Sequence, residues 1–421
     1  MVSTLPASAY ARIAQLAADR RVHQAFKWLH LQEQQILRWQ ADLVAVPAPP
    51  FGEQPRAEWL CQRFRDLNLD EVYLDSIGNA IAVRKAAQSS DPLPASGHSR
   101  ASGRCVLLSA HIDTVFPETL IEPKLEGTRL QAPGACDNGA GVVCLLALAA
   151  ALENAAIDLG CDLVFAGNVG EEGEGDLRGM RYLYERSSFK DSITAHIVLD
   201  GAGHEVAISD ALGSQRYLVT LYGPGGHSWT DAGRPNPIVV LSYAIARLNE
   251  IELTAAPRTT FNVGTIEGGT AINAIPERAS ARFDFRSTDP DQLILLEVEL
   301  HRAVEDAVIA ANRLYSESEK HKVGIEFSIE RIGSRPAGRL SHESPLYETL
   351  RAVDRHLNIR TQARIASTDA NIPLSLGVPA VSLGAGGEGG GIHTRAEWYN
   401  ARGRELGLRR ILLLLLALTT A

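Results

Sequence analysis

The sequence predicts an α/β protein: a mainly parallel sheet flanked by helices, with a smaller α+β domain inserted into it. Short apolar runs alternate with helical segments in the first half of the chain, the order that produces parallel strands covered on both faces. From about residue 212 apolar and polar residues alternate instead, which is typical of a half-exposed antiparallel sheet. A chain of 421 residues also exceeds what one hydrophobic core usually serves, so two domains are expected.

The first domain is expected to cover residues 1–211. Apolar residues recur every three or four positions over residues 8–44, which predicts helix, and the prolines within residues 46–50 end it. Residues 86–104 are rich in serine, alanine, proline and glycine, and they predict an exposed excursion between two strands. The other elements expected here are helices over 58–67 and 141–152 and strands over 80–83, 106–109, 163–166 and 197–199.

The inserted domain is expected over residues 212–330, after which the chain returns to the first domain over residues 331–421. The patterns within the insertion predict strands over 217–222, 260–266, 279–285 and 324–329 and helices over 237–248 and 293–312. A strand over 380–383, a glycine-rich loop and a terminal helix should follow. The apolar run at residues 411–418 is far shorter than the ~20 residues that cross a bilayer, and it predicts the buried face of that helix.

Composition argues against some classes of partner. The formal net charge of −9 is unfavourable for binding nucleic acid or an anionic membrane. The first 50 residues lack the basic, apolar and small-residue succession of a signal peptide. The five cysteines are odd in number and lie mostly in apolar segments, which favours free buried thiols over disulfides. These features predict a cytoplasmic protein.

Residue types that bind zinc lie where predicted strands end. His111 and Asp113 follow the strand at 106–109. Because residues two apart in an extended segment point the same way, Asp113 is expected to contact the imidazole of His111. A carboxylate behind a histidine fixes its tautomer and strengthens it as a ligand. A capped strand end with a solvated pair would explain the same two residues.

Two aspartates lie in similar positions. Asp137 precedes the small-residue helix in a glycine-rich segment, where the backbone can approach another group closely. A metal ligand and a simple N-cap explain Asp137 equally well. Asp200 ends the strand at 197–199 beside Gly201, which suits either a ligand or a turn residue.

Two glutamates and a histidine complete the set. Glu171 and Glu172 follow the strand at 163–166 between glycines, where one carboxylate can bind a cation while its neighbour transfers a proton. A solvated acidic turn would have the same sequence. His393 ends a dense glycine run after the strand at 380–383, and a histidine in such a loop is more often functional than part of a core.

Each of these signals is weak alone, and their combination is stronger. Together they supply the nitrogen and oxygen donors that suit a hydrolytic zinc centre. All of them follow successive predicted strands, which would bring them to one edge of a sheet. The residues therefore predict a zinc hydrolase.

The sequence resembles the dinuclear-zinc exopeptidase and deacylase family, which includes tripeptide aminopeptidase, glutamate carboxypeptidase, acetylornithine deacetylase and succinyl-diaminopimelate desuccinylase. The matching motifs are Ser109-Ala-His-Ile-Asp-Thr114, Asp137-Asn-Gly-Ala-Gly141, Glu171-Glu172, Val198-Leu-Asp200 and Ile392-His-Thr394. The resemblance implies two zinc ions, with cobalt or manganese as alternatives. It assigns one ion to His111 and Asp200 and the other to Glu172 and His393. Asp137 would bridge both ions and be followed by a cis peptide bond.

Further roles follow from the same resemblance. Glu171 would be the general base for the attacking water, and Asp113 would support His111. The insertion resembles the family's lid, which usually also forms a homodimer. Its motif Gly223-Pro-Gly-Gly-His-Ser228 assigns His227 to the developing oxyanion, in its own or the partner subunit's site. The lid-strand motifs make Asn273 and Arg286 candidate substrate-binding residues, Arg286 through a carboxylate.

The expected function is a zinc-dependent exopeptidase, of the aminopeptidase, tripeptidase or carboxypeptidase type, acting on short peptides. Asp200 with its following glycine is similar to the tripeptide aminopeptidase and carboxypeptidase branches, and the run at residues 262–271 is similar to the tripeptidase-like branch. Ser367 stands where the family often has glycine. A deacylase of N-acyl amino acids would use the same metal ligands and base, so the motifs do not separate the two activities. A metal- or peptide-binding protein without catalysis is disfavoured because Glu171 is present. The remaining alternative is an α/β protein with acidic turns and no metal.

Overall fold

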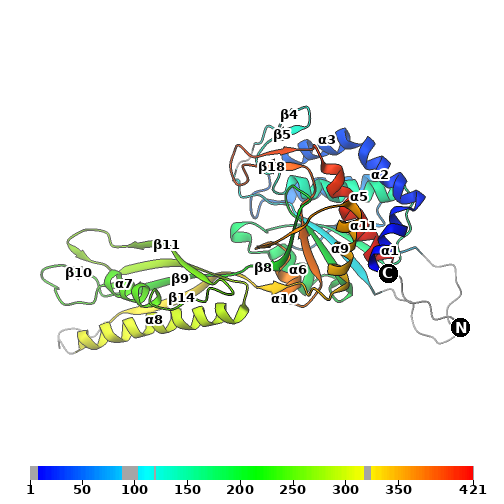
Figure 1. Cartoon of the computed structure of the whole chain (residues 1–421). Coiled ribbons are helices and arrows are strands. Elements are labelled where there is room, and N and C mark those ends of the chain that lie inside the picture. The colour runs from blue at the N-terminus through cyan, green and yellow to red at the C-terminus, as the bar shows by residue number, and fades with distance from the viewer. Residues whose placement is uncertain (1–7, 88–102, 118–119, 317–323, 421) are drawn as a thin grey trace, which may run out of the picture. The chain divides into compact units, whose positions relative to one another are not determined.

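The computed structural model describes residues 8–87, 103–117, 120–316 and 324–420 (Figure 1). The chain divides into two compact units, one comprising Met1–Ala211 and Arg339–Ala421 and the other Leu212–Gly338. The second junction lies beyond residue 330 because strand β14 (Glu326–Arg335) continues the second unit's sheet as far as Arg335. The excursion predicted at residues 86–104 falls almost entirely outside the described residues.

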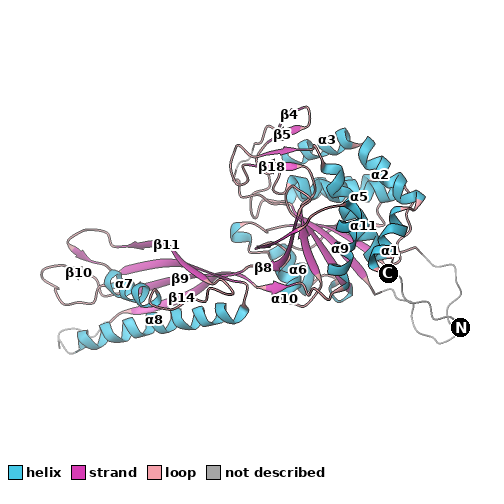
Figure 2. Ribbon diagram, viewed as in Figure 1, coloured by secondary structure: helices cyan, strands magenta, loops and turns pink. Residues whose placement is uncertain are grey.

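The first unit is built on a nine-stranded sheet (Figure 2). Its strands are β1 (Glu71–Leu74), β2 (Ala80–Arg84), β3 (Cys105–His111), β6 (Asp162–Asn168), β7 (Ile193–Leu199), β8 (Val206–Ala211), β15 (Gly338–Arg339), β16 (Gln362–Ala366) and β17 (Ala380–Leu383). They lie in the order β1-β2-β6-β3-β7-β17-β8-β15, with β16 paired to β8. The central strands β6, β3, β7 and β17 are parallel, whereas β1 and β2 run antiparallel to their neighbours, and β8 is antiparallel to β17 but parallel to β16. The predicted mainly parallel sheet is confirmed.

Helices cover both faces of this sheet. The larger core joins one face to α1 (Ala9–Ala17), α2 (Arg20–Leu31), α3 (Glu33–Val44), α4 (Gln54–Asp66), α5 (Gly139–Asn154), α9 (Pro345–Leu357) and α11 (Arg404–Thr419). The smaller core joins the other face to α6 (Arg178–Glu185) and α10 (Asn371–Ser375). Strand β3 shows the alternation directly, because Leu108 belongs to the larger core and Leu107 to the smaller. A strand buried on both faces reads as a continuous apolar run, and such a run predicted this strand from the sequence.

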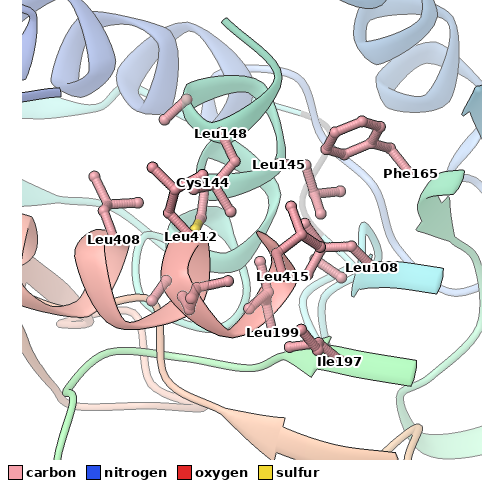
Figure 3. Packing of buried hydrophobic residues seen from close by; sticks show 14 of the residues in the cluster. Leu108, Cys144, Leu145, Leu148, Phe165, Ile197, Leu199, Leu408, Leu412 and Leu415 are labelled. Atoms are coloured by element: carbon pink, nitrogen blue, oxygen red, sulfur yellow. The ribbon is translucent and has the colours of Figure 1, made fainter. Parts of the chain in front are cut away.

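Helices α5 and α11 pack against the middle of the sheet (Figure 3). Leu145 of α5 and Leu412 and Leu415 of α11 are fully buried with Leu108 of β3 and Ile197 of β7. Each such leucine contributes about 1.5–3 kcal/mol on burial. The predicted apolar run at the C-terminus is thus a core helix, and no helix of the described residues is long and apolar enough to cross a membrane. All five cysteines lie in the described residues and are buried and free, as predicted.

A small four-stranded sheet, which the sequence did not predict, connects two loops of the first unit. Its strands are β4 (Lys124–Glu126), β5 (Arg129–Gln131), β18 (Glu388–Gly390) and β19 (Trp398–Asn400), in the order β18-β19-β5-β4. Gln131, at the end of β5, pairs with Trp398, at the start of β19. The chain that leaves β5 therefore lies beside the chain that enters β19.

The second unit is α+β, as predicted. Its antiparallel sheet has the order β11-β13-β9-β14, with β9 (Gly213–Tyr222), β11 (Thr260–Gly268) and β13 (Arg278–Ser287) joining β14. Helices α7 (Pro237–Leu248) and α8 (Pro290–Ser316) pack on one face, where Phe283 and Phe285 are buried. The short strands β10 (Gly226–His227) and β12 (Ala274–Ile275) pair separately.

Candidate metal centre

The five predicted metal ligands lie together in the first unit. His111 is the last residue of β3, while Glu172 and Asp200 follow β6 and β7. Since β3 lies between β6 and β7 and all three are parallel, their carboxyl ends meet at one edge of the sheet. Asp137 and His393 come instead from the loops next to the small sheet. The prediction that every ligand follows a strand of one sheet was wrong for these two residues, which reach the site through the pairing of β5 with β19.

Asp137 lies between the two histidines. Its Oδ1 is 3.0 Å from Nε2 of His111, and its Oδ2 is 3.1 Å from Nε2 of His393. Each histidine also faces a second carboxylate: Oδ1 of Asp200 lies 3.9 Å from His111 Nε2, and Oε1 of Glu172 lies 3.0 Å from His393 Nε2. The contacts thus form two histidine–carboxylate groups that share Asp137.

This geometry fits a metal pair. Zinc holds histidine nitrogen and carboxylate oxygen at about 2.0–2.2 Å in tetrahedral geometry, so ligands of one ion lie roughly 3.3–3.5 Å from each other. The separations of 3.0–3.9 Å between imidazole and carboxylate atoms are close to that value. The candidate ligand atoms of His111, Asp137 and Glu172 all lie within 4.8 Å of one another. The residues present therefore fit one cation on each side of Asp137.

The site carries more buried acids than bases. Burial alone would lower the pKa of His111, but hydrogen bonds to two aspartates raise this pKa well above its ordinary value. Burial, and then the charge of Asp137, raise the pKa of Asp200 well above its usual range. Burial also raises the pKa of Glu172 to about 7, although His111 opposes the shift. Divalent cations between these carboxylates would offset their mutual repulsion and keep them ionised.

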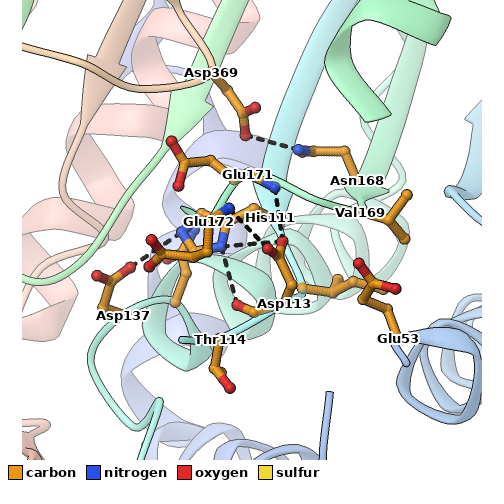
Figure 4. Close-up of polar contacts among 12 residues, drawn as sticks. Glu53, His111, Asp113, Thr114, Asp137, Asn168, Val169, Glu171, Glu172 and Asp369 are labelled. Carbon is orange, nitrogen blue, oxygen red and sulfur yellow. Dashed lines mark hydrogen bonds and ion pairs between the residues drawn. The ribbon is translucent and has the colours of Figure 1, made fainter. Parts of the chain in front are cut away.

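Asp113 contacts the imidazole of His111, as predicted, and also bonds to the next strand's end. Nδ1 of His111 lies 3.1 Å from the main-chain oxygen of Asp113 and 3.6 Å from its carboxylate Oδ1. The carboxylate also accepts hydrogen bonds from the main-chain N–H groups of Glu171, at 3.0 Å, and Glu172, at 2.8 Å (Figure 4). When His111 is neutral, donation by Nδ1 to the main-chain oxygen of Asp113 selects the tautomer in which Nε2, next to Asp137, is free to bind a metal. Asp113 therefore also joins the ends of β3 and β6.

Glu171 is buried beside a second acid (Figure 4). Asp369 is 1% exposed and accepts a hydrogen bond from Nδ2 of Asn168 at 2.7 Å. Burial raises the pKa of Asp369 to about 7, and the negative charge of Glu171 contributes to the increase. Glu171 and Asp369 therefore form a pair of buried acids in the site.

The sequence profile of peptidase family M20/M25/M40 matches residues 107–417. The chain belongs to this family. Membership makes it a hydrolase of the metallopeptidase type. The match spans both units and every residue of the candidate metal centre.

Known proteins of this kind are similar in sequence or fold. Succinyl-diaminopimelate desuccinylase of Corynebacterium glutamicum is 26% identical over 355 residues, which cover 82% of this chain and 86% of the relative. Aminopeptidase PepT of Bacillus cereus has a TM-score of 0.73 at 18% identity, covering 91% of this chain and 98% of the other. A dinuclear metal-binding peptidase of the M20 family from Bacillus subtilis gives 0.66 at 14% identity, covering 93% and 99%. The two structural likenesses confirm the fold.

Two residues of the M20 site were not found from the sequence. Asn138 begins α5: its Oδ1 accepts from the N–H groups of Gly141 and Gly201, and its Nδ2 donates to the main-chain oxygen of Leu199. The Asp137–Asn138 peptide bond is cis, as the resemblance implied. Glu397 is fully buried and bonds to the loop that carries Asp137. Its one signal in the sequence is an acidic residue directly before the strand that begins at Trp398.

The other three predicted residues belong to the second unit. Nδ1 of His227 accepts hydrogen bonds from the N–H groups of Trp229 and Thr230, at 3.2 and 3.4 Å. Asn273 lies close to this turn, because its main-chain oxygen accepts from the N–H of Ser228. Arg286 lies toward the other end of the sheet, where its Nε is 2.7 Å from a carboxylate oxygen of its neighbour Asp284. The structure does not bring Arg286 to His227, and the roles of all three stay predictions.

Proposed function

We propose that this M20-family protein is a dinuclear zinc exopeptidase that removes a terminal residue from short peptides. The observation that carries the proposal is the placement of Asp137, whose two carboxylate oxygens face His111 and His393 separately. A single-ion site has no use for a carboxylate placed in this way. Two ions about 3.5–4 Å apart require one.

The ligands divide between the two ions. His111 and Asp200 would hold one ion and His393 and Glu172 the other, with Asp137 bridging, and cobalt or manganese could replace zinc. When bound, such a pair polarises the scissile carbonyl and lowers the pKa of a coordinated water to near ~7. Asp113 keeps His111 in the tautomer that presents Nε2.

Glu171 would act first as the general base and then as the general acid. Its main chain is bonded to Asp113, so its side chain starts at a fixed point next to Glu172. The carboxylate of Glu171 takes a proton from the attacking water and passes it to the nitrogen that leaves when the amide bond breaks.

The second unit would supply groups that recognise substrate. Arg286 suits a substrate carboxylate, because a guanidinium binds two oxygens at once, and the contact would replace its present partner Asp284. His227 would stabilise the oxyanion, and Asn273 would hydrogen bond to the substrate. We also propose a homodimer formed through this unit. The five free buried cysteines and the net charge of −9 support a cytoplasmic location.

A second activity has its own support. The C. glutamicum desuccinylase is 26% identical to this chain over most of its length, and such an enzyme cleaves an acyl group from an amine. An N-acyl-amino-acid deacylase would use the same ligands and the same base. The choice between the two activities lies in what the second unit recognises.

A substrate panel separates the two activities. The zinc-loaded protein would be given a tripeptide with both termini free, its N-acetylated form, its C-amidated form, and N-acetyl and N-succinyl amino acids. Cleavage of the free tripeptide alone supports an aminopeptidase or tripeptidase, and tolerance of N-acetylation with loss on amidation indicates a carboxypeptidase. Preference for the acyl amino acids supports the deacylase. A protein that binds no zinc and cleaves none of them would contradict the proposal.

A further inference from the structure

Glu397 connects the two loops that deliver Asp137 and His393. It ends the turn that begins near His393, where its N–H donates to the main-chain oxygen of Thr394 at 3.1 Å. Its own main-chain oxygen accepts from the N–H of Ala132 at 3.1 Å, just beyond β5. The side chain is 0% exposed. Glu397 is therefore bonded to both loops at once.

Its carboxylate is held by main-chain donors. Oε1 accepts from the N–H groups of Cys136, at 2.7 Å, and Asp137, at 2.8 Å, and Oε2 accepts from Gly134 at 2.9 Å. No lysine or arginine among the described residues forms an ion pair with Glu397. Burial raises the pKa of Glu397, and the three N–H donors oppose that shift. A buried carboxylate is tolerated when several donors satisfy it in this way.

The loop that carries Asp137 has a backbone conformation that suits the carboxylate of Glu397. Gly134 has φ +72°, and a Cβ there would lie 2.6 Å from Cγ2 of Thr114. With glycine at that position the backbone curls, so that the N–H groups of Gly134, Cys136 and Asp137 converge on one carboxylate. Such a concave set of N–H groups binds an anion. Here the chain itself supplies the anion.

We propose that Glu397 is a positioning residue that fixes Asp137 between His111 and His393 and thereby sets the affinity for the metal pair. The inference rests on the proposed metal centre. The N–H of Asp137 is bonded directly to Glu397, so the direction in which its side chain leaves the backbone depends on this bond. The buried negative charge adds to the field that attracts two dications.

The variant Glu397→Gln tests both parts of the inference. An amide has one acceptor oxygen, and its NH₂ group would face main-chain N–H donors, so at least one of the three bonds is lost. The charge is removed as well. Glu397→Asp keeps the charge and shortens the side chain by one methylene. Glu388→Gln is a matched control, because Glu388 is an exposed glutamate of the same small sheet.

The measurement is the affinity of the folded, metal-free protein for zinc alone, by competition with a chromophoric chelator. We expect Glu397→Gln to bind zinc about 10- to 100-fold more weakly, the range found when a group supporting a metal ligand is replaced. Glu397→Asp should fall between this variant and the wild type, and Glu388→Gln should match the wild type. The thermal midpoint of each metal-free protein, measured in parallel, reports any purely structural loss.

The outcomes separate the proposals. Zinc affinity unchanged in Glu397→Gln, with or without a lower thermal midpoint, would make Glu397 a structural residue only and overturn the inference. Failure of both Glu397 variants to fold would overturn it too, because the carboxylate would then serve the fold itself. A wild-type chain that binds no zinc would instead refute the metal centre, and this inference with it.

Discussion

Nε2 of His393 lies 3.1 Å from Oδ2 of Asp137, although the two residues lie in loops far apart in the sequence. The contact exists because β5 pairs with β19, which places the segment before α5 against the turn that follows β18. His393 has φ +61°, a left-handed conformation that costs a non-glycine residue about 1 kcal/mol or more. The fold maintains that strain where the imidazole meets Asp137, as expected of a functional loop.

Replacing the proposed base should stop catalysis and leave the metals in place. Glu171→Gln keeps the shape of the side chain and removes its ability to accept a proton, so we expect kcat to fall about 10²- to 10⁴-fold. Zinc content, measured by elemental analysis, should match that of the wild type. Glu174→Gln, in the same loop but exposed, is the control and should retain activity. Full activity in Glu171→Gln would show that another group is the base.

Removing the metals should lower stability. Ions that bind only the folded protein stabilise it by about 4 kcal/mol per site at a free concentration ~1000 times Kd. Without them, Asp137, Glu172 and Asp200 face one another with two histidines as counter-charges. Calorimetry should therefore show a higher midpoint with zinc than after dialysis against a chelator. Coincident transitions in the two samples would contradict a specific site.

Acid should destabilise the protein through His196. This histidine is fully buried in β7 between the Ser109 and Tyr184 hydroxyls, and burial lowers its pKa to about 3. In the unfolded chain its pKa is near 6.5, so between these values the unfolded state binds more protons and stability falls as pH falls. The loss at pH 5 is about 2 kcal/mol.

Urea unfolding at pH 5 and pH 7 measures this effect. The free energy of unfolding of the wild type should fall more over this range than that of His196→Gln, which has no titratable group there. Equal pH dependence in the two proteins would show that His196 accepts a proton in the folded state.

Breaking a buried ion pair away from the metal centre should lower the free energy of unfolding more than breaking an exposed pair. Nε and an Nη of Arg410 donate to the two carboxylate oxygens of Asp354 at 2.6 and 2.9 Å, joining α11 to α9 with little exposure. Asp354→Ala leaves a buried charge and should lower the free energy of unfolding by about 3–5 kcal/mol. Asp66→Ala breaks the exposed pair with Arg63 and should cost less than about 1 kcal/mol. Similar losses in urea unfolding would refute the distinction.

The sequence predicted the architecture well because its signals are local. The apolar runs around Leu108, Val164 and Val198 are strands buried on both faces, and the leucine run at Ile411–Leu418 forms a core helix. The change to alternating residues from about residue 212, as in the strand that contains Phe283, identified the antiparallel sheet of the second unit. These patterns depend on burial and on backbone period, which neighbouring residues reveal without a partner.

What the sequence could not give depends on pairing between distant segments. The three-residue strands β5 and β19 carry no periodic signal, so the way Asp137 meets His393 was not foreseen. Glu397 was missed for the same reason, because its hydrogen-bond donors are main-chain N–H groups far away in the sequence. Asp113 contacts His111 as predicted, but the bonds of its carboxylate to the main chain of Glu171 and Glu172 were not foreseen. Periodicity cannot report main-chain donors of this kind.

Two ions are expected on either side of Asp137, and a crystal structure of the zinc-loaded protein with anomalous data around the zinc edge would locate them. We expect two anomalous peaks about 3.5–4 Å apart, one beside His111 and Asp200 and the other beside His393 and Glu172. Both should be within bonding distance of Asp137. No peak at this edge of the sheet, or a single peak that Asp137 does not contact, would contradict the account.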